Sequence, residues 1–593
     1  MYFDGLLNEE FAWDRSCLSH TEVVCGPSEL ISVEEVKAAV SAMKAGKAAG
    51  PSGVVSEMIK AAGEAGVRWM TDLFNQVIAE GKIPDDWRKS LMVTVYKGKG
   101  DALDCGSYRG IKLLDHAMKV FERIIEKRLR TKVNLDDMQF GFRPGRGTTD
   151  AIFIVRQLQE KYLCKGKELW MAFVDLEKAF DRVPREVLWW ALRQLKVEEW
   201  LVRVIMSLYE SVTTAVKVKD KLSEEFEVKV GVHQGSVLSP LLFTIVLEAL
   251  SNSARCGLPW ELLYADDLVL IAESEESLLE KIRKWKAGLE MKGLKVNVGK
   301  TKVMKCKVGS GVVEESGKYP CGVCGKGVRN NSIFCTRCEK WIHKRCSKVK
   351  GKIMSNVGFQ CPKCIGRLKQ TQKVPQDKAK LVLDGGVEFE CVDRFCYLGD
   401  MIGAGGGADL ASQMRVRCAW SKFREIQPIL TARGASLKVK GKMYKACVRS
   451  VMVYGSETWP MKVEDMHRLE RAENMMVRWI CGVTLKSKIS SEELRKRLGI
   501  ESIQDVVRQG RLRWYGHVER KSDEDWVKKC LNLGVDGKVG RGRSRKTWSE
   551  CVKSDMKRLG LKVEDTRDRL LWKRKILGAT SEPCKHGKTD AKR

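Results

Sequence analysis

The ten residues LLYADDLVLI, from Leu262 to Ile271, constrain this chain more than any other stretch. Apolar, β-favouring residues lie on both sides of Asp266 and Asp267, as expected for a short hairpin that is buried on its flanks and open at its turn. Two adjacent carboxylates in a low-dielectric site repel each other unless a cation neutralises them. The stretch therefore indicates a divalent metal site. A solvated Asp-Asp turn is the alternative that this stretch alone leaves open.

Charge and hydropathy limit the classes of protein to which the chain can belong. Its 593 residues carry a net charge of +31, an excess that predicts a polyanionic partner, with nucleic acid as the first candidate. The longest apolar run, Leu238 to Leu250, contains Pro240 and Glu248 and is too short to span a bilayer, so no membrane partner is expected. The N-terminus lacks the blocks of a signal peptide. An intracellular, reducing location follows, and the 21 cysteines need an explanation other than disulfides.

Polar residues follow several predicted strands and turns. Leu169 to Asp175 is typical of a buried strand that ends in a carboxylate, and a basic loop containing Lys97 follows another strand. Lys97 and Arg109 suit phosphate oxygens, although ordinary surface positions are the alternative for both. The turn at Gln234 and Gly235 allows close backbone approach by a ligand.

Seven cysteines and one histidine between residues 321 and 364 have the spacing of zinc ligands. In chain order they are Cys321, Cys324, Cys335, Cys338, His343, Cys346, Cys361 and Cys364. Eight ligands suffice for two tetrahedral Zn²⁺ sites. The interleaved pattern predicts that the first pair binds with the third and the second pair with the fourth.

Four segments occur in an order that resembles motifs A to D of reverse transcriptases: FVDLEKAFD, GVHQGSVLSP, YADD and GLKVNVGKTK. The flanking text, including QFGFRPGRGTTDA, FCYLGDMI and RWYGHVER, resembles the polymerase of a non-LTR (LINE-type) retrotransposon. The resemblance implies an α+β right-hand polymerase. Its expected parts are an N-terminal extension (1–45), fingers (46–165), palm (166–308), a primer-grip hairpin (380–402), a thumb (403–500) and a helical, basic C-terminal region (501–593).

The resemblance also implies a role for each site residue. Asp175, Asp266 and Asp267 would be catalytic and hold two Mg²⁺ ions. Residues expected to bind the nucleotide are Lys97 and Arg109 at the triphosphate, the Leu176 carbonyl, Phe180 as steric gate, Gln234, Gly235, and Lys300 as a proton donor to pyrophosphate. Residues expected to contact the primer are Tyr264, Tyr397, Leu398 and Gly399. Phe180 can also be a core aromatic, and Asp181 is expected to be structural. One departure is Ser52, where the family pattern has an aspartate.

The cysteine-rich insertion, residues 318–367, resembles a PHD finger because Trp341 lies two residues before the histidine and Phe359 two before the last pair. A histone tail is a candidate partner, with Tyr319 and Trp341 as walls of a methyl-lysine cage. The function expected is RNA-directed DNA synthesis from dNTPs, on an RNA template with a DNA primer or target, in the nucleus. A domesticated or inactive copy that binds chromatin or nucleic acid through the finger is the alternative, and a maturase-like or telomerase-like polymerase is a third. No nicking endonuclease is visible, so the chain looks like a truncated copy or a fragment of a polyprotein.

Overall fold

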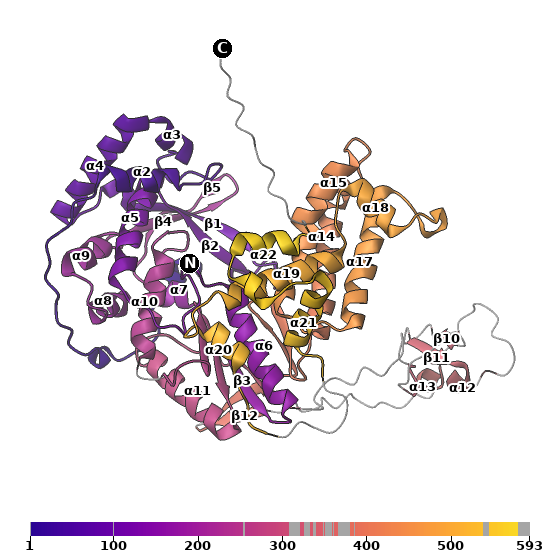
Figure 1. The fold of residues 1–593 in the computed structure, drawn as a ribbon. Coiled ribbons are helices and arrows are strands. Elements are labelled where there is room, and N and C mark those ends of the chain that lie inside the picture. The colour runs from indigo at the N-terminus through magenta and orange to yellow at the C-terminus, as the bar shows by residue number, and fades with distance from the viewer. Residues whose placement is uncertain are drawn as a thin grey trace, which may run out of the picture.

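The computed structural model describes most of the chain (Figure 1). The described residues are 2–98, 100–252, 255–307, 321–324, 332–335, 340–347, 349, 359, 361–365, 380–384, 386–537 and 545–578. Helices and strands alternate through the first 400 residues, and helices dominate from there on. In these ranges, no helix has the length and apolar character needed to cross a membrane.

A six-stranded sheet forms the centre of the molecule, with strand order β12-β13-β9-β3-β8-β7. Its strands are β3 (Leu169–Val174), β7 (Glu261–Tyr264), β8 (Asp267–Ala272), β9 (Lys302–Cys306), β12 (Lys380–Leu383) and β13 (Val387–Cys391). Every residue of β3 is buried, because β3 runs antiparallel between β8 and β9 and its apolar side chains pack on both faces. Helices that surround this sheet or lie next to it are α6 (Thr148–Cys164), α7 (Ala179–Arg182), α8 (Arg185–Gln194), α10 (Ser239–Ser251) and α11 (Glu275–Glu290).

A second sheet lies on the N-terminal side of the molecule, with the order β2-β1-β4-β5 and β6 paired to β4. Its strands are β1 (Lys89–Tyr96), β2 (Tyr108–Leu113), β4 (Thr213–Val218), β5 (Lys221–Leu222) and β6 (Phe226–Glu227). Accompanying helices are α1 (Tyr2–Asn8), α2 (Val33–Ser41), α3 (Ser56–Ala61), α4 (Gly63–Glu80), α5 (His116–Lys132) and α9 (Glu199–Ser207). The ranges expected for fingers and palm meet in this sheet, because β4 pairs with β1, and β5 and β6 pair with β4.

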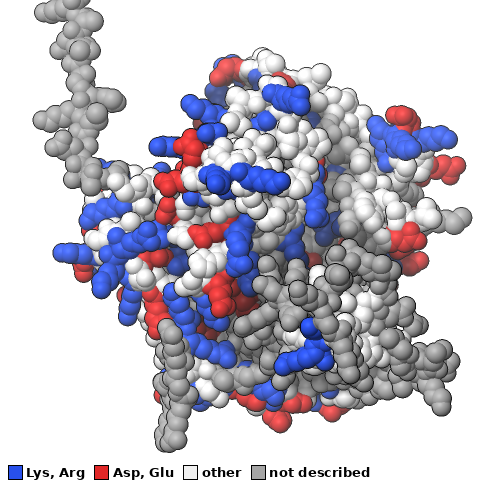
Figure 2. Space-filling view, turned by 90° about the vertical axis from the view of Figure 1, so that its right-hand side faces the viewer, with Lys and Arg blue, Asp and Glu red and all other residues white. Residues whose placement is uncertain are grey.

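A hairpin of β14 (Arg394–Tyr397) and β15 (Asp400–Gly403) leads from the central sheet into a separate helical core. The helices of this core are α14 (Asp409–Thr431), α15 (Leu437–Tyr444), α16 (Ser450–Val453), α17 (Val463–Cys481) and α18 (Ser491–Leu498). Figure 2 shows the side of the molecule on which these helices lie, with Lys and Arg gathered most densely in the left-hand part of the view. Many of the Lys and Arg side chains that give the chain its positive charge are thus exposed on this face.

The C-terminal region returns to the central core. Helices α19 (Ile503–Glu519), α20 (Trp526–Asn532), α21 (Trp548–Leu559) and α22 (Arg569–Ile576) pack together, and α20 packs against α6. The Phe153 ring of α6 makes edge contacts with Trp514 and Trp548, at centroid distances of 5.7 and 4.8 Å. Residues 545–578 therefore contain helices that pack against the rest of the chain. Residues 579–593 lie outside the described residues.

The cysteine-rich insertion follows β9 and precedes β12. Its described elements are the antiparallel pair β10 (Ser332–Cys335) and β11 (Lys340–His343), and the short helices α12 (Lys344–Ser347) and α13 (Pro362–Ile365). Its small core contains Cys321, Cys335, Ile342, Cys361 and Cys364. A core this small buries little apolar area, which is typical of modules that depend on metal for folding.

Candidate active site and zinc groups

Strand pairing brings the three predicted carboxylates together. Asp175 follows the last residue of β3, and Val174 pairs with Leu268, the residue after Asp267. Tyr264 pairs with Asp267 across the turn of β7 and β8. The Asp175 Oδ2 atom is buried and makes no hydrogen bond, and the Lys300 ammonium lies 3.4 Å from it. The end of β3 and the β7–β8 turn therefore bring the three carboxylates close enough for their charges to interact.

The electrostatics of these carboxylates favour a bound cation. Partial burial raises the pKa of Asp267 to about 6, and repulsion from Asp266 and Asp175 adds to the shift. The pKa of Asp266 is also raised, first by burial and then by Asp175. Because the protein supplies too little positive charge to offset three acids, hard divalent cations with oxygen ligands fit this donor set.

The turn that carries Asp266 and Asp267 is held by the segment 139–141. Ala265 adopts a left-handed conformation with φ of 54°, and its N–H donates to the side-chain oxygen of Gln139 at 3.2 Å. The Phe140 N–H donates to the Leu263 carbonyl at 2.7 Å. A Cβ on Gly141 would lie 2.4 Å from the Ala265 nitrogen, so only glycine permits this approach.

A pocket of about 330 Å³ adjoins Asp266 and is lined by four further residues predicted to bind the nucleotide. These are Arg109, Phe180, Gln234 and Gly235. Phe180 is half-buried and stacks on Phe243 with a centroid distance of 4.2 Å, so it is a core aromatic on one face while it also lines the pocket. Residues from three separate segments of the chain thus form one cavity beside the carboxylates.

Asp181 and the backbone at Lys112 hold the turn that contains Gln234 and Gly235. Gln234 donates its amide to Asp181 at 2.7 Å, and Gly235 has φ of 121° with the Lys112 carbonyl 2.3 Å from where a Cβ would be. Asp181 therefore orients Gln234, consistent with its expected structural role. Burial raises the pKa of Asp181, and Gln234, Lys112 and Lys178 oppose that rise.

Cations gather around Arg109, which lines this pocket. Burial lowers the pKa of Lys97, and the nearby Arg109, Lys300 and Lys178 lower it further. Lys97 donates to the Gly106 carbonyl at 2.7 Å. Such a concentration of positive charge suits a triphosphate.

Leu176 is buried next to Asp175. Its backbone bridges to Val296, while the Asp175 carbonyl accepts from the Asn297 N–H at 2.8 Å. The loop before β9 is thereby attached to the end of β3, which places Lys300 beside Asp175.

Two of the residues predicted to contact the primer, Tyr264 and Tyr397, lie near Asp267. Tyr397 is buried, its hydroxyl has no hydrogen-bond partner, and burial followed by the charge of Asp267 raises its pKa. Leu398 and Gly399 form the two-residue turn between β14 and β15, with φ of 46° and 81°. Tyr264 is half-buried, and burial raises its pKa.

Side chains of the helical region anchor this turn. The Tyr454 hydroxyl donates to the Leu398 carbonyl and accepts from the Thr148 hydroxyl of α6, each at 3.0 Å, and Arg415 donates to the Gly399 carbonyl. Within the same hairpin Asp400 is fully buried and forms an ion pair with Arg156 at 2.7 Å. The turn is therefore held between α6, α14 and the segment before α17.

Two buried residues that support the pocket were not identified from the sequence. Glu122 accepts from the Ser236 hydroxyl at 2.6 Å and from the Val237 N–H at 3.0 Å, and burial raises its pKa. Lys112 is buried beneath Gly235, and burial lowers its pKa to about 7. One feature of the sequence could have identified Glu122 as a buried acid: it stands among the apolar residues of α5.

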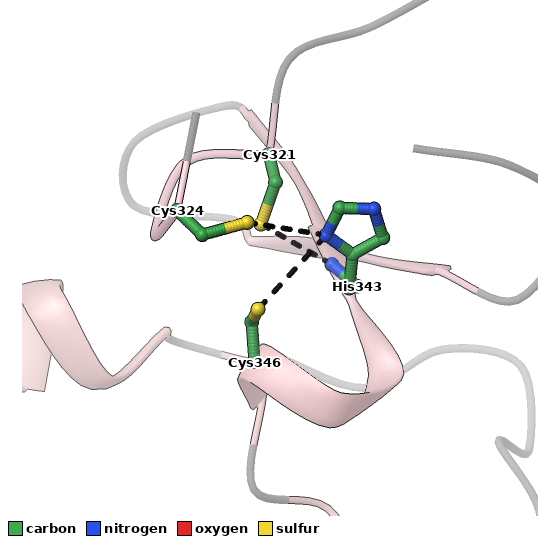
Figure 3. A group of neighbouring side chains, drawn as sticks. All are labelled: Cys321, Cys324, His343 and Cys346. Atoms are coloured by element: carbon green, nitrogen blue, oxygen red, sulfur yellow. Dashed lines mark hydrogen bonds between the residues drawn. The ribbon is translucent and has the colours of Figure 1, made fainter. Parts of the chain in front are cut away.

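The cysteine-rich insertion contains two groups of potential metal ligands. Cys321, Cys324, His343 and Cys346 form one group, in which ligand atoms lie within 4.8 Å of one another, and Figure 3 shows them converging from β11, α12 and the segment 321–324. The second group is Cys335, Cys361 and Cys364. This is the interleaved grouping that the spacing predicts. Cys338, the expected eighth ligand, and Tyr319 lie outside the described residues.

Comparison with known proteins gives a consistent result. Residues 96–346 match the family model described as reverse transcriptase (RNA-dependent DNA polymerase). The chain is 28% identical to a probable RNA-directed DNA polymerase from transposon BS of Drosophila melanogaster, over 83% of this chain and 49% of that protein. It is 29% identical to a Pol polyprotein from the retrotransposable element R2 of Nasonia vitripennis, over 45% of this chain and 26% of that protein.

Two further matches are to a mobile-element polymerase and to a solved telomerase structure. Identity to the RNA-directed DNA polymerase from mobile element jockey of Drosophila funebris is 30%, over 42% of this chain and 28% of that protein. A structure of apo telomerase from Candida tropicalis aligns with a TM-score of 0.30 and 16% identity, over 41% of this chain and 56% of that one. The chain thus spans half or less of the length of these curated relatives.

Proposed function

We propose that this chain, whose residues 96–346 match the reverse transcriptase family, is the RNA-directed DNA polymerase of a non-LTR retrotransposon. One observation carries the proposal: Asp266 lines a pocket together with Arg109, Phe180 and Gln234, and its charge interacts with that of Asp175. The proposed substrates are dNTPs, and the proposed partners are an RNA template and a DNA primer or target.

The three carboxylates would hold two Mg²⁺ ions, which in such sites activate the primer 3′-hydroxyl and stabilise the charge on the leaving pyrophosphate. Lys97 and Arg109 would bind the triphosphate, and the Leu176 carbonyl would face the nucleotide. Lys300, already 3.4 Å from Asp175, would donate a proton to pyrophosphate. Gln234 and Gly235 would border the base pair that forms.

The fingers (46–165), palm (166–308), primer grip (380–402) and thumb (403–500) are proposed on the same basis. Tyr264, Tyr397, Leu398 and Gly399 would contact the primer. The effect of the Asp267 charge on Tyr397 supports this, because a primer 3′ end must lie next to the metal-binding acids.

Primer extension on poly(rA)/oligo(dT) with Mg²⁺ tests the enzyme assignment. Asp266→Ala should abolish incorporation, since a metal ligand is lost, whereas Lys553→Ala on the exposed face of α21 should leave it intact. Equal incorporation by the parent chain and Asp266→Ala would refute the proposal.

Phe180→Ala tests the steric gate. Because the ring lines the pocket beside Asp266, its removal should admit ribonucleotides and lower the preference for dNTPs by at least tenfold in kcat/KM. The fold should persist, since one face of Phe180 is already open. Unchanged sugar discrimination would assign Phe180 to the core alone.

We further propose that residues 318–367 form a PHD-type finger with two structural Zn²⁺ ions. The grouping of Cys321 with His343 and of Cys335 with Cys361 supports this. Metal analysis of the full chain should find two zinc ions, and Cys335→Ser should lower the content to one. Cys396→Ser, an exposed cysteine outside the module, serves as control.

A second candidate function is a domesticated or inactive copy that binds chromatin or nucleic acid. Trp341 favours it weakly, because 37% of its surface is exposed on β11 and an exposed aromatic suits a histone-tail site. Titration of the zinc-loaded chain with histone-tail peptides tests this partner. Binding with no primer extension would favour the second function and a nuclear role without catalysis.

A further inference from the structure

A hollow of about 430 Å³ lies where four segments meet, away from the nucleotide pocket. It is bordered by the C-terminal half of α6, the glycine segment 403–407, the start of α14 and the residues before α21. Its volume is within the range of ligand pockets in proteins. Nothing in the proposed polymerase chemistry uses it.

The hollow is at the far end of α6 from the carboxylates. Thr148, at the first turn of α6, bonds to Tyr454 and so lies beside the Leu398 turn, whereas Gln159 lines the hollow. Eleven helical residues separate them, which corresponds to about 17 Å. Gln159 also bonds to Cys306, which pairs with Leu169 at the end of β3 opposite Asp175.

Five exposed cations surround the hollow. They are Arg394, Arg417, Lys462, Arg545 and Lys546. Within the described part of the chain, none of the five has a carboxylate within ion-pair distance, although many other Lys and Arg residues do. Unneutralised cations that converge from four segments favour an anionic ligand.

Three acids also line the hollow, and they do not cancel this charge. Asp393 is exposed at its rim and Asp409 begins α14. Glu160 accepts from the Trp548 N–H at 2.9 Å, and burial raises its pKa to about 7, so it is partly neutral under physiological conditions. The cations therefore exceed the ionised acids.

The glycine floor of the hollow is rigid. A Cβ on Gly403 would lie 2.6 Å from Leu410, and one on Gly406 would lie 2.9 Å from Leu163. Gln159 donates to the Gly403 carbonyl at 2.7 Å and Arg156 donates to the Gly407 carbonyl at 2.8 Å. The cavity is thus preformed, which lowers the entropic cost of binding.

We propose that this hollow is a second nucleic-acid site, which receives a phosphate-bearing nucleotide of a single strand outside the polymerase cleft. These cations, of which Arg545 also donates to the Gly405 carbonyl, would bind the phosphates, and the hollow would accommodate one nucleotide unit. A duplex backbone would contact the rim without filling the cavity, so a single strand fits better. Element RNA and displaced DNA share this chemistry.

Binding by the full chain tests the proposal directly. A labelled single-stranded 12-mer, as RNA and as DNA, is titrated by fluorescence anisotropy at several salt concentrations, with an unlabelled RNA–DNA hairpin saturating the cleft. The double variant Arg417→Ala/Lys462→Ala should bind one or both strands about tenfold more weakly. The slope of log K against log salt should fall by about 1.4, since each lost phosphate contact on a single strand removes about 0.7.

A matched double variant, Lys553→Ala/Lys557→Ala, removes two exposed lysines from α21 and should change binding less than twofold. The proposal would be overturned if both double variants lost the same amount of single-strand affinity. It would also be overturned if Arg417→Ala/Lys462→Ala lost as much affinity for duplex DNA, or if a free nucleoside monophosphate displaced the labelled strand as well as an unlabelled strand does. Because binding is measured and not synthesis, the result is independent of polymerase activity, and primer extension by Arg417→Ala/Lys462→Ala should stay within twofold of the parent.

Discussion

At the predicted metal site, the charge on individual acidic residues lowers the stability of the metal-free folded chain. In the folded chain the pKa of Asp267 is about 6 instead of 3.8, so the folded state prefers the protonated acid. An acid whose pKa rises on folding costs nothing below its unfolded pKa, and its cost grows as the pH rises from about 4 to about 6. The metal-free protein should therefore carry this penalty at pH 8 and lose it at pH 4.

Asp267→Asn should accordingly stabilise the metal-free protein while it abolishes polymerisation. The gain at pH 8 should be about 1 kcal/mol or less, because solvent screens the exposed carboxylates. Thermal unfolding in EDTA at pH 8 and pH 4 measures it, with Glu280→Gln on α11 as the control. A gain of the same size at both pH values would contradict the electrostatic origin.

Gly141 is a residue at which one methyl group should impair the site. Its Cβ would meet the Ala265 nitrogen at 2.4 Å, so Gly141→Ala should displace the turn that carries Asp266 and lower kcat at least tenfold. In Gly147→Ala the nearest atom outside the neighbouring residues is 3.7 Å away, so that variant should change kcat little. Steady-state primer extension compares the two, and similar kcat values would contradict the steric argument.

At the scale of elements, the β14–β15 hairpin depends on one buried ion pair. Asp400 is fully buried, pairs with Arg156 of α6 and accepts from the Trp459 indole at 3.2 Å. Breaking such a pair leaves an uncompensated charge in the interior, which costs about 3 kcal/mol. The hairpin is thus attached to α6 by charge as well as by packing.

Asp400→Asn should therefore lower the free energy of unfolding by about 3 kcal/mol, as measured by urea denaturation. Glu280→Gln, which removes the exposed ion pair with Lys284, should change it much less, because water screens that pair. Equal effects would mean that the Arg156 charge finds another partner.

Elements with strong local patterns agree with the sequence. Ser32 and Glu35 form a capping box at the start of α2, and the side chain of Ser274 caps α11. Local side-chain periodicity and capping encode these elements, so no long-range contact is needed to predict them.

At the scale of the whole molecule, the C-terminal helices are part of the central core. Trp548 is 1% exposed, contacts Phe153 of α6 and donates its indole N–H to the Glu457 carbonyl at 2.7 Å. It joins segments nearly 400 residues apart in the chain. The helices α19 to α22 and the central sheet should therefore unfold together.

Trp548→Ala should destabilise the protein by about 4 kcal/mol and separate the unfolding of the C-terminal helices from that of the sheet. Trp69→Ala, in which the removed ring is 64% exposed, should have little effect. Differential scanning calorimetry distinguishes one transition from two. A single transition at an unchanged temperature would contradict the proposed role of Trp548.

The sequence by itself determined which chemical groups this protein has and in what order. The paired aspartates, the zinc-ligand spacing and the charge of +31 are local or summed properties, and they can be counted without knowing where the chain goes. Only the tertiary structure decided which groups meet, because pairs such as Val174 with Leu268, Arg156 with Asp400 and Phe153 with Trp548 join positions that are 94 to 395 residues apart. Strand register and helix packing set such distances, and no periodicity along the chain encodes them.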